Sequence, residues 1–183
     1  MSAPEFSTLA TERLILEPFA HGHSDGIFTL WSSPEVCRYS GEAQDWEGQR
    51  IELPARSPVD SDKILGFFIR RAAEGSGVRW AVISRESDRC LGAVGLNALA
   101  PRAELAYHIH PDHWGSGHAT EACAAVIHWC QENLPNVAIE AFVEPENESS
   151  TRLAGRLGFK ETSALRDGAR QYLLAPRGNS PHA

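Results

Sequence analysis

Residues 113–121 read His-Trp-Gly-Ser-Gly-His-Ala-Thr-Glu and place two glycines directly before a helical pattern. Gly115 and Gly117 lack the β-carbons that would hold a ligand away from the backbone. The first turn of a helix leaves N–H groups without intrahelical partners, and these donors, with the positive end of the helix dipole, suit a phosphate or pyrophosphate. An ordinary strand-to-helix turn also needs glycine, so the pair alone leaves both interpretations open.

Two common nucleotide-binding patterns are absent from this stretch. A dinucleotide fingerprint requires a third glycine three residues after Gly117, where Thr120 stands. The Gly-Lys-Ser/Thr of the P-loop does not occur either. These departures disfavour a general nucleotide-binding site.

The elements on either side of the glycines would position them. Residues 103–109 alternate with a period of two, which is typical of a strand with two different faces. Leu105, Tyr107 and Ile109 share one face, and Glu104, Ala106 and His108 share the other. Downstream, apolar residues recur at spacings of three and four until Asn-Leu-Pro at 133–135. The sequence therefore predicts a strand, a glycine turn and a helix.

The rest of the chain supplies further strands with helices between them. We expect strands at 13–19, 80–84, 90–97, 137–143, 159–166 and 169–175, and helices at 24–31, 57–72 and 149–156. Residues 41–56 show no clear period and are predicted to form a loop. Asp167-Gly168 predicts a hairpin turn between the last two strands. This succession predicts an α+β fold in which helices flank a mixed, mostly antiparallel sheet.

Composition limits the class of protein. With 183 residues, 42% hydrophobic and 22% charged, the chain is predicted to form one domain over 1–183, with a disordered tail at about 178–183. A net charge of −7 argues against a nucleic acid as the main partner. No apolar run approaches the roughly 18 residues that cross a membrane, and the N-terminus lacks a signal-peptide pattern, so we expect a cytoplasmic protein. The four cysteines show no Cys-x-x-Cys spacing and are expected to be reduced thiols.

Three segments, in this order along the chain, carry a resemblance to a known family. Trp114 to Ala122 resembles the acyl-CoA pyrophosphate loop of the GNAT acetyltransferases, in the version found in the branch of the ribosomal-protein N-terminal (alanine/serine) acetyltransferases. Thr11 to Pro18 is similar to the opening strand of that branch. Asn147 to Arg152, followed by Leu-Gly-Phe at 157–159, is similar to its Asn-x-x-Ser helix and closing motif.

The resemblance implies a fold and a co-substrate. It implies the GNAT fold, in which two central parallel strands, here 103–109 and 137–143, splay apart and hold the pantetheine arm of acetyl-CoA between them. A splayed pair leaves backbone N–H and C=O groups that need a partner. The residues that would contact acetyl-CoA are His108, Ile109, His110, Trp114, Gly115, Ser116, Gly117, His118, Ala119, Thr120, Asn147 and Ser150.

Acetyl transfer from a thioester to an amine needs a neutral amine, a donor to the oxyanion and a proton for the leaving thiolate. The resemblance implies a backbone N–H near 108–110 as the oxyanion donor. The tyrosine that many family members use as the acid has no counterpart, because Ala154 stands in its place. In the resembled branch the acid is the serine of Asn-x-x-Ser, here Ser150, with Asn147 holding the pantetheine. The alternative is that Asn147 and its serines only cap a helix.

For the general base we predict Glu104, directly or through water, because it shares a strand face with His108. A partly desolvated carboxylate there would have a pKa suited to taking a proton from an ammonium group. The alternative is a solvated or salt-bridged strand residue. His108, His110 and Glu144 compete for the role, and enough free amine to need no base is a further alternative.

The sequence thus predicts an N-acetyltransferase that uses acetyl-CoA to acetylate a primary amine, on a protein N-terminus or a small molecule, by direct attack in a ternary complex. The alternative is a non-catalytic acyl-CoA-binding sensor or interaction module. Glu17 stands where the branch commonly has a second arginine, so the branch's acceptor does not transfer directly. The histidines at 108, 110, 113, 118 and 128 lack ligand spacing, and we expect no metal. A monomer and a homodimer both fit the sequence.

Overall fold

The computed structural model describes residues 5–178, and its frame is an eight-stranded mixed sheet in the order β1-β2-β5-β6-β7-β8-β10-β9. All neighbours in this sheet are antiparallel except β7 and β8. The strands of the sheet are β1 (Leu9–Ala10), β2 (Leu14–Pro18), β5 (Val78–Ser84), β6 (Cys90–Leu96), β7 (Ala103–Ile109), β8 (Ile139–Val143), β9 (Lys160–Arg166) and β10 (Ala169–Leu174). The predicted α+β class and the mostly antiparallel sheet are confirmed.

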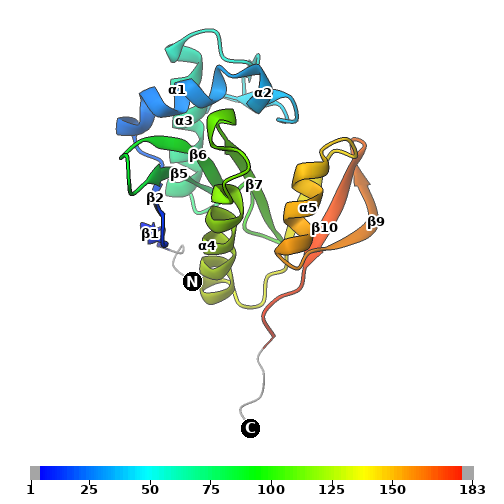
Figure 1. Cartoon of the computed structure of the whole chain (residues 1–183). Coiled ribbons are helices and arrows are strands. Elements are labelled where there is room, and N and C mark those ends of the chain that lie inside the picture. Colours follow the sequence, from blue (N-terminus) through cyan, green and yellow to red (C-terminus); the bar gives the residue numbers. More distant parts are fainter. Residues whose placement is uncertain (1–4, 179–183) are drawn as a thin grey trace.

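Helices cover both faces of the sheet because alternate strand residues are apolar on both faces. Trp80 and Val94 belong to a core that includes α4, whereas Ala81 and Ala93, next to them in the strands, pack against α1 and α3. In Figure 1, α4 lies in front of β7 and α3 lies behind the sheet. The helices are η1 (His21–His23), α1 (Ser24–Trp31), α2 (Pro34–Cys37), α3 (Pro58–Ala73), η2 (Pro111–His113), α4 (His118–Asn133) and α5 (Glu148–Arg156).

One predicted loop contains a small hairpin. Residues 41–56 include β3 (Ala43–Gln44) and β4 (Arg50–Ile51), which pair antiparallel outside the main sheet. Asp45 holds the turn between them, because its Oδ1 accepts hydrogen bonds from the N–H groups of Glu47 and Gln49. A short hairpin held by side chain-to-backbone hydrogen bonds needs no alternating apolar residues, so its strands leave no hydrophobic period in the sequence.

The central parallel strands pair only at their base. The partners are Ala103 with Ile139 and Glu104 with Glu140, and no further pairing joins β7 to β8 within residues 5–178. Beyond that point β7 continues to Ile109, while β8 stays paired with β10 on its other edge. Figure 1 shows β7 and the unit of α5, β9 and β10 diverging from this common base. The splay that the resemblance implied is confirmed.

Other predictions concern the whole chain. No helix within residues 5–178 is long and apolar enough to cross a membrane. All four cysteines are free thiols, two of them buried on α4. Residues 179–183 of the predicted tail lie outside the described residues. The single-domain organisation, the cytoplasmic location and the monomeric or homodimeric state stay predictions.

Candidate active site

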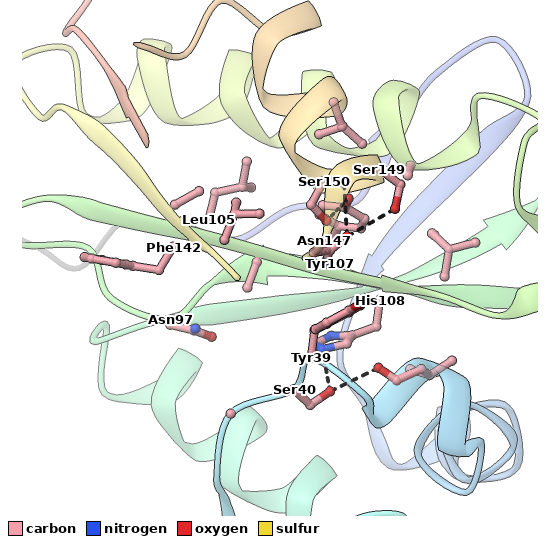
Figure 2. A pocket seen from close by; sticks show the side chains of 18 of the residues that line it. Tyr39, Ser40, Asn97, Leu105, Tyr107, His108, Phe142, Asn147, Ser149 and Ser150 are labelled. Carbon is pink, nitrogen blue, oxygen red and sulfur yellow. Dashed lines mark hydrogen bonds between the residues drawn. The ribbon is translucent and has the colours of Figure 1, made fainter. Parts of the chain in front are cut away.

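An open cavity of about 920 Å³ runs from one face of the sheet to the other beside the splayed part of β7. Its two parts are named after the helices that they face, the α4–α5 side and the α1–α3 side. The α4–α5 side is lined by Tyr107, Trp114, Gly115, Gly117, Asn147 and Ser150, and the α1–α3 side by Ser40, Phe67, Phe68, Arg71, Arg79, Asn97, Glu104 and His108. Figure 2 shows Tyr107, Asn147 and Ser150 above the strands, and Ser40, Asn97 and His108 below them. The cavity therefore connects the two faces of the sheet.

The glycine loop begins α4 in the geometry that an anion site needs. Gly115 and Gly117 have φ angles of 74° and 80°, in the left-handed region that favours glycine. Gly117 is the N-cap of α4 and offers no side chain to the first helical N–H groups. These N–H groups stay available to an external acceptor at the positive end of a 16-residue helix.

The opening strand segment fixes this loop in place. Arg13 donates from Nη1 to the carbonyl of Ser116 at 2.8 Å and from Nε to a carboxylate oxygen of Glu121 at 2.7 Å. The other oxygen of Glu121 accepts from the Thr11 hydroxyl and from the backbone N–H of Arg13. Two of the motifs that carry the family resemblance thus meet in one hydrogen-bonded network. This network positions the loop without occupying its N–H groups.

On the α4–α5 side, two hydroxyl groups face each other across the gap. Tyr107 Oη lies 2.7 Å from Ser150 Oγ, and either atom can be the donor. Burial raises the pKa of Tyr107 to about 12, so its phenol is neutral and keeps a proton at physiological pH. Asn147 caps α5 with Oδ1, which accepts from the N–H of Ser150, and its amide NH₂ group is left for a ligand. The capping role and a ligand contact are therefore compatible.

The backbone of β7 turns unpaired groups toward the gap. The Ala103 N–H donates to Ala138 on the β8 side, while the Glu104 N–H donates to Ala98 on the opposite side. Because these directions alternate along a strand, Tyr107 and Ile109 present their backbone polar groups to the gap. The indole of Trp114 donates to the carbonyl of Ile109 at 2.7 Å. The N–H of Ile109 faces the gap and has no acceptor among the residues that the structure describes.

His108 points to the opposite side, against α1. Its Nε2 lies 3.1 Å from Ser40 Oγ, and its ring packs on Trp31 with centroids 4.6 Å apart. Because the Ser40 hydroxyl donates to the Val36 carbonyl, we assign the ring proton to Nε2, which leaves Nδ1 as a buried acceptor without a partner. Burial, helped by the charge of Arg79, lowers the pKa of His108 to about 3. The imidazole is neutral at physiological pH and too weakly basic to deprotonate an ammonium group.

Glu104 is held by two partners. Arg166 donates to both of its oxygens at 2.7 and 2.8 Å, and Asn97 Nδ2 donates at 2.9 Å. The hydrogen bond from Arg166 outweighs the effect of burial and lowers the pKa of the carboxyl. A carboxylate with a lowered pKa is a weaker base. This pairing matches the salt-bridged alternative and argues against the predicted role of Glu104 as general base.

The cavity brings most of the predicted residues together. Its lining includes Glu104, His108, Ile109, Trp114, Gly115, Gly117, His118, Ala119, Thr120, Asn147 and Ser150, but not His110 or Ser116. The N–H of His110 is used by the Leu91 carbonyl. Within residues 5–178, no group of three or more His, Cys, Asp or Glu side chains is arranged to hold a metal ion. The roles of these residues stay predictions.

Sequence reasoning missed the polar residues that the fold brings in from elsewhere. Tyr107 was assigned only to a strand face, although a hydroxyl between two aliphatic neighbours was a signal for a partnered polar tip. Arg71, Arg79, Asn97 and Arg166 come from four separate elements or loops, and no local pattern marks them.

Comparison with known proteins identifies the family. Residues 13–160 match the model of the Acetyltransferase (GNAT) domain. The chain belongs to the GNAT family. It is 33% identical over 165 residues to the uncharacterized N-acetyltransferase YoaA of Bacillus subtilis, with 88% of this chain and 87% of the relative covered. It is 32% identical over 163 residues to the uncharacterized N-acetyltransferase p20 of Bacillus licheniformis, with 87% and 86% covered. The protein is accordingly an acyltransferase.

Solved structures share this GNAT fold. An acetyltransferase from Agrobacterium tumefaciens superposes with a TM-score of 0.73 at 24% identity, over 93% of this chain and 95% of that one. RimL, a ribosomal α-N-protein acetyltransferase in complex with coenzyme A, superposes with a TM-score of 0.73 at 14% identity, over 93% and 98%. At these identities the likeness concerns the fold.

Proposed function

We propose that this GNAT protein transfers the acetyl group of acetyl-CoA to a primary amine by direct attack within a ternary complex. The observation that carries the proposal is that the glycine loop of α4 and the unpaired section of β7 open onto one cavity. The loop N–H groups suit the pyrophosphate, and the unpaired backbone of Tyr107 suits the amides of the pantetheine arm. Asn147 offers its amide NH₂ to the same arm. RimL, which shares the fold, binds coenzyme A.

The reacting atoms meet where the cavity passes through the sheet. The amine nitrogen attacks the thioester carbonyl carbon, and the N–H of Ile109 donates to the oxygen on which negative charge develops. The carbon–sulfur bond then breaks, and Ser150 donates its proton to the departing thiolate. Tyr107, whose hydroxyl lies 2.7 Å away, returns a proton to Ser150 and takes one from water, so that both hydroxyl groups end the cycle protonated. Holding both substrates side by side supplies much of the acceleration.

The proton of the incoming amine leaves to water in this proposal. Both oxygens of Glu104 are occupied by Arg166 and Asn97, and His108 is too weakly basic. The amine therefore attacks from its neutral fraction, which grows as the pH approaches the pKa of the amine. This predicts that kcat/KM rises with pH through the neutral range.

Calorimetric titration with acetyl-CoA, with NADH and ATP as controls, tests the donor. We expect micromolar binding of acetyl-CoA alone. Folded protein, free of copurified coenzyme A, that does not bind acetyl-CoA would contradict the proposal. A thiol-release assay against a broad amine panel then tests transfer. Binding without turnover of any amine would favour the sensor alternative.

A further inference from the structure

The α1–α3 side of the cavity carries two arginines to which the proposed reaction gives no role. Arg71 comes from α3 and Arg79 from β5, and Phe67 and Phe68 of α3 line the cavity beside them. Arg71 Nη2 donates to the carbonyls of Ser76 and Asn97 at 2.9 and 2.7 Å. The Nε of Arg71 is buried and has no partner among residues 5–178. This side of the cavity is therefore rich in hydrogen-bond donors.

Arg79 is the more deeply buried of the two, with 4% of its surface exposed. Its side chain crosses β6 at Gly95, where a β-carbon would lie 2.8 Å from Arg79 Cδ. It then donates to the Ala106 carbonyl at 3.0 Å and to Asn97 Oδ1 at 2.5 Å, and lies over the Phe68 ring. The Nε of Arg79 is buried and finds no partner in the described part of the chain. Burial lowers the pKa of Arg79 to about 10, so the guanidinium stays charged at physiological pH.

Neither Arg71 nor Arg79 has a carboxylate within 4.0 Å in the part of the chain that the structure describes. Glu104 faces them, but its two oxygens are bonded to Arg166. The remaining acidic residues of the lining are engaged elsewhere, Glu35 with Ser33 and Glu42 with Arg50. A buried charge without a counter-ion is costly, and a carboxylate is the usual partner of a guanidinium. This part of the cavity has an excess of positive charge that an anionic ligand would balance.

We propose that the acceptor is an amine that also bears a carboxylate, of the class of free amino acids, with its carboxylate toward Arg79 and Arg71. This inference rests on the proposed transfer reaction and narrows its acceptor. The amine then faces the gap beside Tyr107 and Ile109, and Phe67 and Phe68 offer an apolar surface to the side chain. Figure 2 places Asn97, which bonds to both arginines, below the strands and across them from Ser150.

The same charges disfavour two other acceptor classes. A polyamine would bring two or more ammonium groups beside Arg71 and Arg79, neither of which pairs with a carboxylate among residues 5–178. Like charges in a partly desolvated site repel strongly. A protein N-terminus carries an amide where a free amino acid carries its carboxylate, and so leaves the guanidinium groups without a counter-ion.

The test compares amines that differ only in this charge. Wild-type enzyme is assayed with saturating acetyl-CoA and a panel of L-amino acids, the matching L-amino acid amides and spermidine. Because charge-assisted hydrogen bonds are worth about 1.5–3 kcal/mol, we expect kcat/KM for the best acid to exceed that of its amide by at least about tenfold at equal concentration of neutral amine. Amides or spermidine acetylated as well as or better than the acids would overturn the inference.

Variants assign the preference to the arginines. Arg71→Gln should lower kcat/KM for the acids about tenfold by raising KM, and leave the amides within about twofold. Arg70→Gln is the matched control, because Arg70 is the neighbouring residue of α3 but is exposed and paired with Glu74. An equal loss for acids and amides in Arg71→Gln would contradict the assignment. Arg79→Lys keeps a positive charge but cannot make both hydrogen bonds of the guanidinium, so we expect it to lower the acid-to-amide ratio. The ratio is read only for protein that circular dichroism shows to be folded.

Failure of the inference can be told apart from failure of the proposed function. Turnover of some amine without an acid preference overturns only the carboxylate inference. If no amine is acetylated although acetyl-CoA binds, transfer is contradicted. Calorimetric titration of the coenzyme A complex with the acids and amides then decides the carboxylate inference by itself. Tighter binding of the acids supports it, and equal or weaker binding overturns it.

Discussion

The two sides of the cavity are built in different ways. The α4–α5 side is assembled from short contiguous motifs, the glycine loop and the Asn-x-x-Ser turn, whose backbone groups are the proposed binding groups for acetyl-CoA. The α1–α3 side is assembled from single side chains of α3, β5, β7 and the loop after β6, which meet only in the folded protein. The difference fits a family in which the donor is shared and acceptors differ. In the proposed function, backbone groups bind the donor that family members share, and side chains that can be exchanged by substitution bind the acceptor.

The largest effect should come from the backbone of the α4–α5 side. Gly117→Val places a branched side chain at a φ of 80° and in the path of the pyrophosphate, so we expect acetyl-CoA affinity to fall by at least about a hundredfold in calorimetry. Gly48→Val is the control, because Gly48 has a φ of 82° but does not line the cavity. Unchanged affinity in folded Gly117→Val would remove the loop from the donor site.

The next largest effect should fall on turnover. Ser150→Ala removes the proposed acid, and we expect kcat to fall about a hundredfold while the Kd of acetyl-CoA stays within twofold. Ser149→Ala is the control, since Ser149 is the adjacent serine and bonds only to Asn147 Oδ1 among the described residues. Tyr107→Phe, which leaves Ser150 in place, should cost about tenfold. A kcat for Ser150→Ala equal to that of Ser149→Ala would exclude Ser150 as the acid.

A smaller effect, on the free energy of unfolding, should show that Glu104 has a structural role. Its folded-state pKa is lowered, so its contribution to stability is present above the unfolded pKa of about 4.5 and is lost as pH falls through the folded value. We expect Glu104→Gln to unfold more easily than wild type at pH 7 by about 1 kcal/mol in urea titrations, discounted for the half-exposed Arg166. The difference should shrink as the pH falls below 4.5 and through the lowered pKa of Glu104. Glu74→Gln, in an exposed helical ion pair, controls for loss of charge.

The same variant tests the general base. A structural Glu104 predicts a loss of kcat of less than about tenfold in Glu104→Gln. A loss of more than a hundredfold, with little change in stability, would restore the carboxylate as the base.

The smallest effect should come from the residue that positions the glycine loop. Arg13→Gln breaks the bonds to Ser116 and Glu121 but leaves the loop N–H groups in place, so we expect acetyl-CoA affinity to fall about threefold to fivefold. Arg152→Gln, in an exposed pair with Glu148, measures the effect of removing a positive charge from the same side of the cavity. Equal losses in the two variants would mean that Arg13 acts only through its charge.

The sequence was sufficient to predict the parts of the candidate site that consist of consecutive residues. Alternation over 103–109 and the apolar stripe over 119–130 predicted β7 and α4, and the glycines predicted the loop between them. The splay came from the resemblance, because no residue of β7 or β8 signals that pairing stops after Glu104. The partner of Glu104 could not be predicted, since Arg166 is 62 residues away and reaches it only through the β9–β10 hairpin. The place of Arg79 in the cavity could not be predicted either, because its partners Asn97 and Ala106 lie elsewhere in the sequence.

The short pairing of β7 with β8 also bears on how the protein opens. Residues 139–174, which comprise β8, α5, β9 and β10, are tied to the rest of the sheet by two backbone residue pairs and by the packing of α5 on α4. Side-chain contacts add the Tyr107–Ser150 hydrogen bond and the ion pairs Arg166–Glu104 and Arg102–Glu140. A unit attached by so few hydrogen bonds can detach at a lower free energy than global unfolding requires. A ligand that bonds to both edges of the gap adds its binding free energy to the attachment. We therefore expect bound acetyl-CoA to raise the free energy at which residues 139–174 detach, and so to make unfolding more cooperative.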